Sequence, residues 1–193
     1  MKDIRGKGKT ISCELVFLVI IALMLAGCAD SNKIIRSDNK AIPALTSNEK
    51  IYIGINRDGV YGDEAYPGSG LTLSQLLLSS FSKHVRRVEI GKEYQQYDDA
   101  LRTSRSNGYN VFIYPTILHW ENHLTEWNGI PDKVKVKIDV IETEKDELLY
   151  YIIIEGKSGL ATFGGDQPQD LLVKPIDEFV SSMFSAGSAR SNK

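Results

Sequence analysis

The chain has 193 residues, of which 42% are hydrophobic and 25% are charged, so it is long enough for one globular domain with a short appendage. The first 27 residues carry four basic and two acidic side chains, which leaves 19 of the 23 basic and 23 of the 25 acidic residues in the rest of the chain. Because this remainder is acidic and contains no basic run, we expect no nucleic-acid partner.

The N-terminus has the pattern of a secretion signal. A basic stretch, Met1–Lys9, precedes an apolar run over residues 15–26, which is shorter than the about 20 residues of a transmembrane helix. The Leu-Ala-Gly-Cys sequence that ends the run resembles the lipobox of bacterial lipoproteins, in which a diacylglycerol is attached to the cysteine before cleavage. The sequence therefore predicts a signal peptide over residues 1–27 and an anchor in membrane lipid through acylated Cys28. The alternative is an uncleaved signal anchor with an incidental cysteine.

The signal peptide is expected to be cleaved between Gly27 and Cys28. The residue after the cysteine then helps to predict in which membrane the lipoprotein is anchored. Lipoproteins with Asp directly after the cysteine resemble those kept at the inner membrane, whereas here Ala29 takes that place and Asp30 follows. We therefore expect the protein at the outer membrane, facing the periplasm. Cys13 lies in the signal, so the mature chain has a single cysteine and no disulfide.

The mature chain divides into three parts. Residues 28–49, which begin with the acylated cysteine, are polar and have no sustained period, so we predict a flexible tether there. Residues 50–185 are predicted to form a periplasmic α/β domain, and residues 186–193 a disordered tail.

The domain opens with a strand and a helix. Lys50–Asn56 has apolar residues at alternating places, which indicates a strand. A glycine-rich loop over residues 57–70 follows. Thr72 and Gln75 then have the spacing of a capping box, which predicts a helix over Leu71–His84.

The middle of the domain repeats this alternation. A strand is predicted over Val85–Gly91, and a helix capped by Asp98 is expected to end at residues 107–108, Asn-Gly. Val111–Tyr114 is apolar on both faces, as in the centre of a covered sheet, and the proline that follows should bulge the strand or cost it a neighbour. Residues 117–127 are expected to continue as an extended arm.

A hairpin and a helix complete the domain. Lys133–Ile141 alternates between apolar and charged residues, which predicts a strand with one buried face, and Leu148–Glu155 is its predicted partner. The last helix is expected to begin near Asp166 and Pro168 and to turn five apolar side chains inward: Leu172, Ile176, Phe179, Val180 and Met183. The order βαβαβββα predicts an α/β (α+β) fold, with one mixed sheet of about five strands and helices on its faces.

Two motifs suggest chemistry but do not complete it. His119 and His123 flank Glu121, yet in an extended strand their imidazoles would lie about 13 Å apart, so we predict no metal site. Gly68-Ser69-Gly70 precedes a helix but lacks the Lys-Ser/Thr of a phosphate-binding loop. With no assembled catalytic set, we predict no catalytic residue, no cofactor and no enzymatic activity.

Two groups of residues are candidates for binding. Trp120, Glu121 and Trp127 lie on the predicted arm, and Tyr114 ends the strand before it. These residues would contact a partner protein, because aromatic side chains are common at binding surfaces. The leading hypothesis is therefore a non-enzymatic accessory lipoprotein that binds another envelope protein.

The rival is a small-ligand-binding or hydrolytic domain that uses the glycine-rich loop. Its candidate residues are Tyr61, Tyr66, Gly68, Ser69 and Gly70. A well-formed pocket lined by the two tyrosines and the glycine amides would favour this rival.

The chain resembles a bacterial lipoprotein family known as a domain of unknown function, of the DUF4823 type. The resemblance lies in five segments: Tyr109–Pro115, His119–Glu121, Thr125–Trp127, Pro131–Val134 and Gly164–Leu172. It spans Lys50–Phe184 and implies no established activity. The strand order is also similar to the small periplasmic domain shared by the TolB N-terminal region, curli-secretion lipoproteins and lipoprotein activators of peptidoglycan synthases, a likeness of fold that implies no function.

Overall fold

The computed structural model describes residues 30–37, 41–123, 130–159 and 167–191, so the predicted signal peptide and Cys28 lie outside the described residues. Six strands form the main sheet: β1 (Ser31–Arg36), β2 (Lys50–Ile55), β5 (Arg87–Tyr94), β6 (Val111–Glu121), β7 (Lys133–Glu142) and β8 (Glu147–Lys157). A small hairpin is formed by β3 (Gly59–Tyr61) and β4 (Glu64–Tyr66), and the helices are α2 (Ser69–Phe81), α3 (Tyr97–Ser106) and α4 (Asp170–Ser191). Within the described part of the chain, none of these helices is long and apolar enough to cross a membrane.

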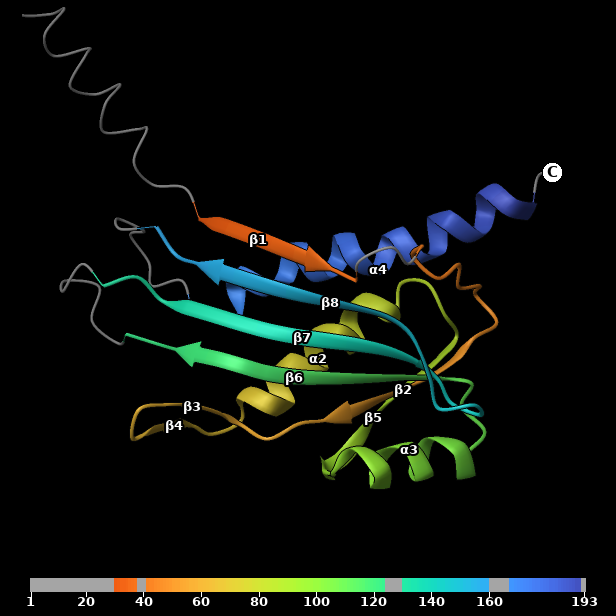
Figure 1. Ribbon diagram of the computed structural model, residues 1–193, viewed down its shortest axis with the longest axis horizontal. Helices are drawn as coiled ribbons and strands as arrows, with labels where there is room; N and C mark the ends of the chain where they lie inside the picture. The colour runs from red at the N-terminus through yellow and green to blue at the C-terminus, as the bar shows by residue number, and fades with distance from the viewer. Residues whose placement is uncertain (1–29, 38–40, 124–129, 160–166, 192–193) are drawn as a thin grey trace, which may run out of the picture.

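The sheet is mixed, as the sequence predicted, with the strand order β1-β8-β7-β6-β2-β5 (Figure 1). β2 is parallel to both β5 and β6, and α2 and α3 form the connections between these strands. The pairs β6–β7, β7–β8 and β8–β1 are antiparallel. From β2 onward the main elements follow the predicted order βαβαβββα, to which the structure adds β1 and the β3–β4 hairpin.

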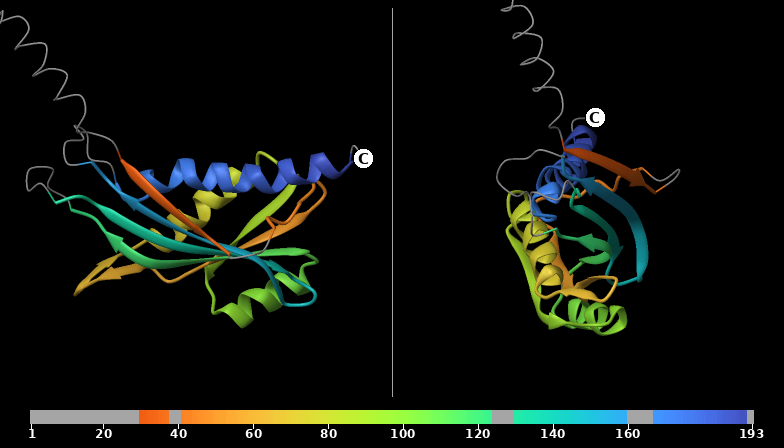
Figure 2. Two further views of the ribbon diagram at one scale, coloured as in Figure 1. Left: turned by 45° about the horizontal axis from the view of Figure 1, so that its top comes forward. Right: turned by 90° about the vertical axis from the view of Figure 1, so that its left-hand side faces the viewer.

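Each face of the sheet has its own apolar core. Figure 2 shows α2 and α4 on one side of the sheet and α3 on the other. On one face α2 and α4 pack against the strands, and the five α4 side chains predicted to face inward are all buried: Leu172, Ile176, Phe179, Val180 and Met183. On the other face α3 covers one end only, where Leu101 packs with Phe112. The rest of this second face, formed by β1, β8, β7 and the last part of β6, is not covered by any helix of the described residues, and we call it the open face.

The hairpin of β7 and β8 confirms the clearest sequence pattern. Val134, Val136, Ile138 and Val140 are buried, while the charged residues between them lie on the open face. The presence of a proline at position 115 of β6 is also explained. β2 pairs with β6 only as far as Ile113, so no residue of β2 requires a hydrogen bond from the proline nitrogen, which has no hydrogen to donate.

The predicted tether is corrected by β1. Residues 31–36 form a strand that pairs with β8 over its whole length, from Ser31 opposite Lys157 to Arg36 opposite Ile152. The edge of β8 offers unpaired backbone groups, and a polar segment with two isoleucines satisfies them as an edge strand. The domain also starts before residue 50, since Leu45 is buried and its amide donates to the Met183 carbonyl at 3.1 Å.

Helix boundaries depart from the sequence predictions in three places. α2 begins at Ser69 rather than Leu71, with no capping box, because Gly68 adopts a left-handed conformation (φ 85°) and ends the preceding turn. α3 begins at Tyr97, with Gln96 rather than Asp98 at its N-cap position. α4 continues to Ser191, into the predicted disordered tail, since no proline after residue 175 interrupts it.

Candidate functional site

A bulge in β6 decides which side chains reach the open face. The pairing of β6 with β7 shifts register between Ile117 and His119. One extra residue in a strand moves every later side chain to the opposite face of the sheet. Trp120 therefore enters the core and is 3% exposed, while His119 and Glu121 turn to the open face.

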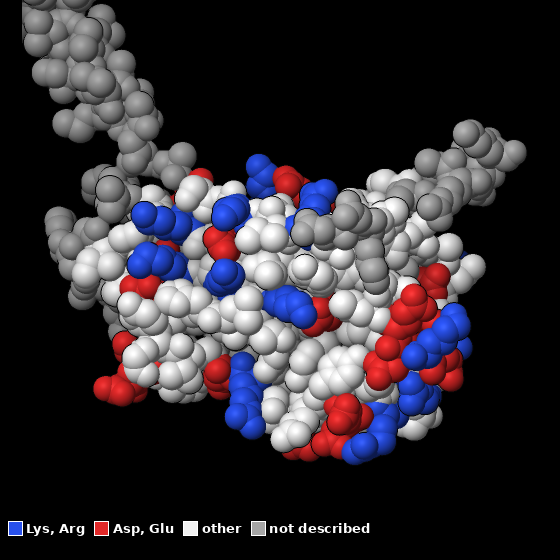
Figure 3. All heavy atoms as spheres, in the orientation of Figure 1, with Lys and Arg blue, Asp and Glu red and all other residues white. Residues whose placement is uncertain are grey.

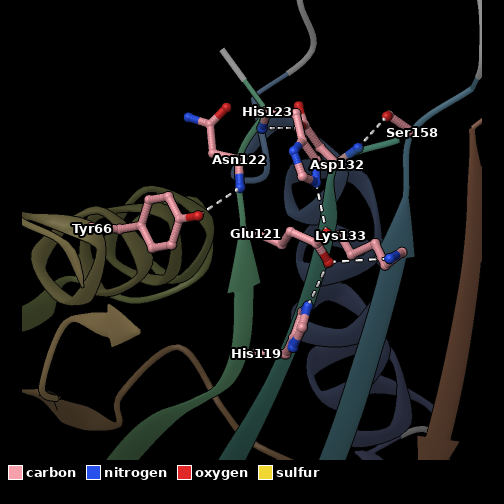
Figure 4. Close-up of polar contacts among 8 residues, drawn as sticks. All are labelled: Tyr66, His119, Glu121, Asn122, His123, Asp132, Lys133 and Ser158. Atoms are coloured by element: carbon pink, nitrogen blue, oxygen red, sulfur yellow. Dashed lines mark hydrogen bonds and ion pairs between the residues drawn. The ribbon is translucent and has the colours of Figure 1, made fainter. Parts of the chain in front are cut away.

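Three side chains converge there on the carboxylate of Glu121. We call these three, His119, His123 and Lys133, together with Glu121 the Glu121 cluster (Figure 4). His119 Nε2 lies 3.0 Å from Glu121 Oε2, and His123 Nε2 lies 2.6 Å from Oε1. Lys133 Nζ donates to Oε2 at 3.1 Å. An ionised carboxylate only accepts hydrogen bonds, so both imidazoles carry hydrogen on Nε2.

Glu121 is held as an anion in this setting. Its side chain is 4% exposed, and this burial acts to raise its pKa. The hydrogen bonds from His119, His123 and Lys133 outweigh burial and lower the pKa to about 2. Both oxygens are occupied by donors, and no three His, Cys, Asp or Glu side chains in the described residues are placed to hold a metal ion. The cluster is therefore a closed, charged support for the end of β6.

The chain on either side of the cluster is also fixed. The Asp132 carboxylate accepts from the His123 amide at 2.6 Å, and the Asp132 amide donates to Ser158 Oγ at 2.9 Å (Figure 4). The Asn122 amide donates to Tyr66 Oη at 3.3 Å, which joins β6 to the hairpin. These contacts hold the ends of three strands and the hairpin together.

Beside the Glu121 cluster lies a groove of about 630 Å³ on the open face. The register places Lys157 opposite Lys133, and Glu155 opposite both Lys33 and Lys135, so that residues from four strands line it. The lining residues are Ser31, Asn32, Lys33, Leu118, His119, Lys133, Val134, Lys135, Glu155, Gly156 and Lys157.

We call Lys33, Lys133, Lys135 and Lys157 the basic end. Figure 3 shows blue Lys and Arg side chains gathered over β1, β7 and β8, which form this part of the open face. These lysines form no basic run in the sequence, because they are separated by up to 124 positions (157 − 33). Only the antiparallel register brings them together. The four lysines face two carboxylates, Glu121 and Glu155, which leaves a local charge of +2 on an acidic domain.

The predicted arm is not an exposed partner surface as a whole. Trp120 and Glu121 are each 3% exposed, so neither offers area to a partner, and the prediction for these two is corrected. Tyr114 is half-buried, with its ring 5.3 Å from that of Tyr97. Trp127 lies outside the described residues. The segment became a paired strand because β7 supplies a hydrogen-bonded neighbour as far as residue 121.

The expectation for the two histidines is also corrected. An ideal strand would keep them far apart, but both rings lean toward the residue between them and share its carboxylate. Sequence reasoning did not find this cluster. One signal was available, because adjacent apolar residues at Ile117 and Leu118 break the alternation of the strand and mark the bulge.

The glycine amides of the predicted ligand loop already have an acceptor. Asp58 Oδ2 accepts from the Gly68 amide at 3.0 Å and Oδ1 from the Gly70 amide at 2.9 Å. Ser69 is buried, and its Oγ accepts from the Gly59 amide at 2.8 Å. A carboxylate thus occupies the glycine amides that a ligand of this loop would have to contact. A hollow of about 340 Å³ beside Tyr66 is lined mainly by polar groups.

Replacing Asp58 with alanine should lower the free energy of unfolding by about 1–2 kcal/mol, because Asp58 acts as the cap that the first turn of α2 otherwise lacks. Urea unfolding followed by circular dichroism measures the change. Asp63 lies in the β3–β4 turn and accepts no hydrogen bond from any residue that the structure describes, so Asp63→Ala is the control. Equal stability of the two variants would contradict the capping role.

Comparison with known proteins identifies relatives of the fold. The family described as "Domain of unknown function (DUF4823)" matches residues 44–183. No curated protein sequence matches the chain. The PelC dodecamer from Paraburkholderia phytofirmans has a similar structure, with a TM-score of 0.63 at 12% identity over 79% of this chain and 97% of that one.

Two further structures are more distant. Protein XCC0632 from Xanthomonas campestris, of the DUF330 family, has a TM-score of 0.49 at 8% identity over 83% of this chain and 97% of that one. Lipoprotein GNA1162 from Neisseria meningitidis has a TM-score of 0.37 at 10% identity over 75% of this chain and 99% of that one. Of these three structures, PelC is the one similar enough to show a shared fold, and at 12% identity it shows the fold alone.

Proposed function

The chain belongs to the DUF4823 family, and we propose that it is a lipid-anchored envelope lipoprotein whose domain binds another envelope protein without catalysing a reaction. The Leu-Ala-Gly-Cys sequence that ends at Cys28 supports the anchor, and Ala29 after the cysteine supports the periplasmic face of the outer membrane.

The partner surface that we propose carries three exposed apolar side chains beside the Glu121 cluster. Val60 is 60% exposed, Tyr61 45% and Leu118 47%, and the first two lie in β3 while the third lies at the β6 bulge. β3 packs against β6, and the Tyr61 ring lies against His119, the residue after Leu118. Large apolar side chains exposed near one another favour protein binding, and tyrosine is among the residues that dominate such interfaces. This patch of Val60, Tyr61 and Leu118 is the single observation that carries the proposal.

The patch is held in shape before any partner arrives. Gly59 approaches Trp120 so closely that an added Cβ would lie 2.5 Å from the tryptophan Cβ. The Tyr61 ring meets His119 edge-on, with 4.9 Å between ring centroids. Because the Glu121 cluster fixes His119, it also fixes the ring of Tyr61. A pre-organised surface loses less conformational entropy when it binds.

A photo-crosslinking amino acid placed at Tyr61 or Leu118 in living cells should trap one defined envelope protein. Val173 on α4 is as exposed as Tyr61, at 45%, and lies outside the patch, so it is the matched control and should not trap that protein. The same set of products from all three positions would contradict the proposal. A product between two copies of this chain would also contradict it, and would point instead to self-assembly of the kind named for the PelC dodecamer.

A further inference from the structure

We propose that the basic end binds the phosphate groups of anionic lipid headgroups, so that the domain lies directly on the membrane with its open face and strand ends in a fixed orientation. The proposal rests on the lipid anchor of the proposed function. The two surfaces adjoin at Leu118, which also lines the groove, but the lysines and the exposed side chains of β3 are distinct: Lys33 and Lys157 lie on β1 and β8, whereas Val60 and Tyr61 lie on β3.

The position of Asp30 leaves no slack between the anchor and the sheet. Asp30 Oδ1 accepts a hydrogen bond from the Gly159 amide at 3.0 Å, so the chain is already attached to the domain at this residue. Cys28 precedes Asp30 by two residues, which span at most about 7 Å. The next residue, Ser31, begins β1 and lies opposite Lys157. The strand end that carries Lys157 must therefore lie beside the lipid.

The register brings the other lysines to the same end of the sheet. Lys157 is the last residue of β8, Lys133 is the first of β7, and Lys33 lies near the start of β1. Antiparallel pairing makes these three positions neighbours at one end of the open face, the end at which β1 begins (Figure 1). Phosphate groups at the membrane surface would thus face a row of ammonium groups.

Two of the four lysines have their charge available for a ligand. Lys133 pairs with Glu121 at 3.1 Å and Lys135 with Glu155 at 2.7 Å. Lys33 and Lys157 form no ion pair with a described residue, although Lys33 lies opposite Glu155 and, after the hydrogen bond from Lys135, its charge helps to lower the pKa of that carboxyl. The mature chain as a whole carries 19 basic and 23 acidic residues and would be repelled by an anionic bilayer, so attraction requires that this local surface faces the lipid.

The test uses the mature chain, residues 28–193, with Cys28→Ser so that no acyl chain contributes, and measures co-sedimentation with vesicles. Vesicles of phosphatidylglycerol and phosphatidylcholine in equal parts should bind the chain, and vesicles of phosphatidylcholine alone should not. Lys33→Gln with Lys157→Gln should weaken binding about 30-fold, because each lysine near an anionic surface contributes about 1 kcal/mol.

The control is Lys92→Gln with Lys145→Gln, which removes the same charge from β5 and from the turn at the other end of the β7–β8 hairpin. This variant should bind within about twofold of the parent chain, because an exposed charge more than about 10 Å from the surface is screened by salt. Equal binding to both kinds of vesicle, or equal loss in the two variants, would overturn the proposal. Because this chain carries no lipid, that result would leave the anchor at Cys28 to be judged by fatty-acid labelling.

Discussion

Replacing Cys28 with serine in the full chain should abolish incorporation of labelled fatty acid and leave the signal peptide attached. The reaction expected at the lipobox forms a thioether to the cysteine sulfur, and the serine oxygen does not take its place. Cleavage after Gly27 follows lipid attachment, so the variant should accumulate as a precursor. Several acyl chains make membrane attachment effectively permanent, whereas a single chain binds only marginally. Because Cys28 is the single cysteine of the predicted mature chain, we expect the loss of label to be complete rather than partial.

The chain offers its own control for this experiment. Cys13 is the other of its two cysteines and lies inside the predicted signal, so Cys13→Ser should be labelled and processed as the parent chain is. Metabolic labelling with palmitate and the apparent mass of the product measure both effects. Label in the Cys28→Ser variant, together with normal processing, would exclude the anchor and with it the orientation proposed for the basic end.

The regular elements were predictable where one physical pattern acts alone. β7 has one face in the core and the other at the surface, so Val134 to Val140 alternate with charges and the strand can be read directly. The helices were found through their apolar faces, and their ends were placed less well. At α2 the cap comes from Asp58, a residue ten positions away from Gly68, and local motifs do not report such a partner.

The candidate site depends on features that no local pattern encodes. β1 is polar and short of periodicity because it is an edge strand in which no residue is fully buried, so it resembles a tether in sequence. The basic end exists only through the register of two antiparallel strand pairs. The β6 bulge left a visible trace at Ile117 and Leu118, but the consequence for Glu121 depends on the partners that β7 supplies.

These features share one origin, the crowding of strand ends at the anchored end of the sheet. Residue 31 begins β1, residue 121 ends β6, residue 133 begins β7 and residue 157 ends β8, and all four meet there. Glu121 is the buried charge among them, and it holds Lys133 and the two histidines in place. If the domain binds both a membrane and a partner protein at this end, a rigid end favours both interactions, because a surface that must first be ordered binds more weakly.

Glu121→Gln should accordingly lower the free energy of unfolding by about 3 kcal/mol near neutral pH, since a pKa of about 2 in the folded chain against 4.5 as the ordinary value stores that much stability. The folded-state pKa is depressed, so this stability is present above about pH 4.5 and is lost as the pH falls toward 2. The difference in the free energy of unfolding between parent and variant should thus shrink to about half of its neutral-pH value by about pH 3.

The matched control is Glu155→Gln, which breaks an ion pair of the same kind in the same groove. The Glu155 side chain is 33% exposed against 4% for Glu121, so solvent screens its pair with Lys135 and the loss should stay below about 1 kcal/mol. Urea unfolding followed through tryptophan fluorescence measures both variants across the pH range. If the two variants lost equal stability, or if the Glu121→Gln gap stayed constant from neutral to acid pH, the end of β6 would not depend on a buried carboxylate. Rigidity at the anchored end would then have to come from other contacts, such as those that Asp132 makes with His123 and Ser158.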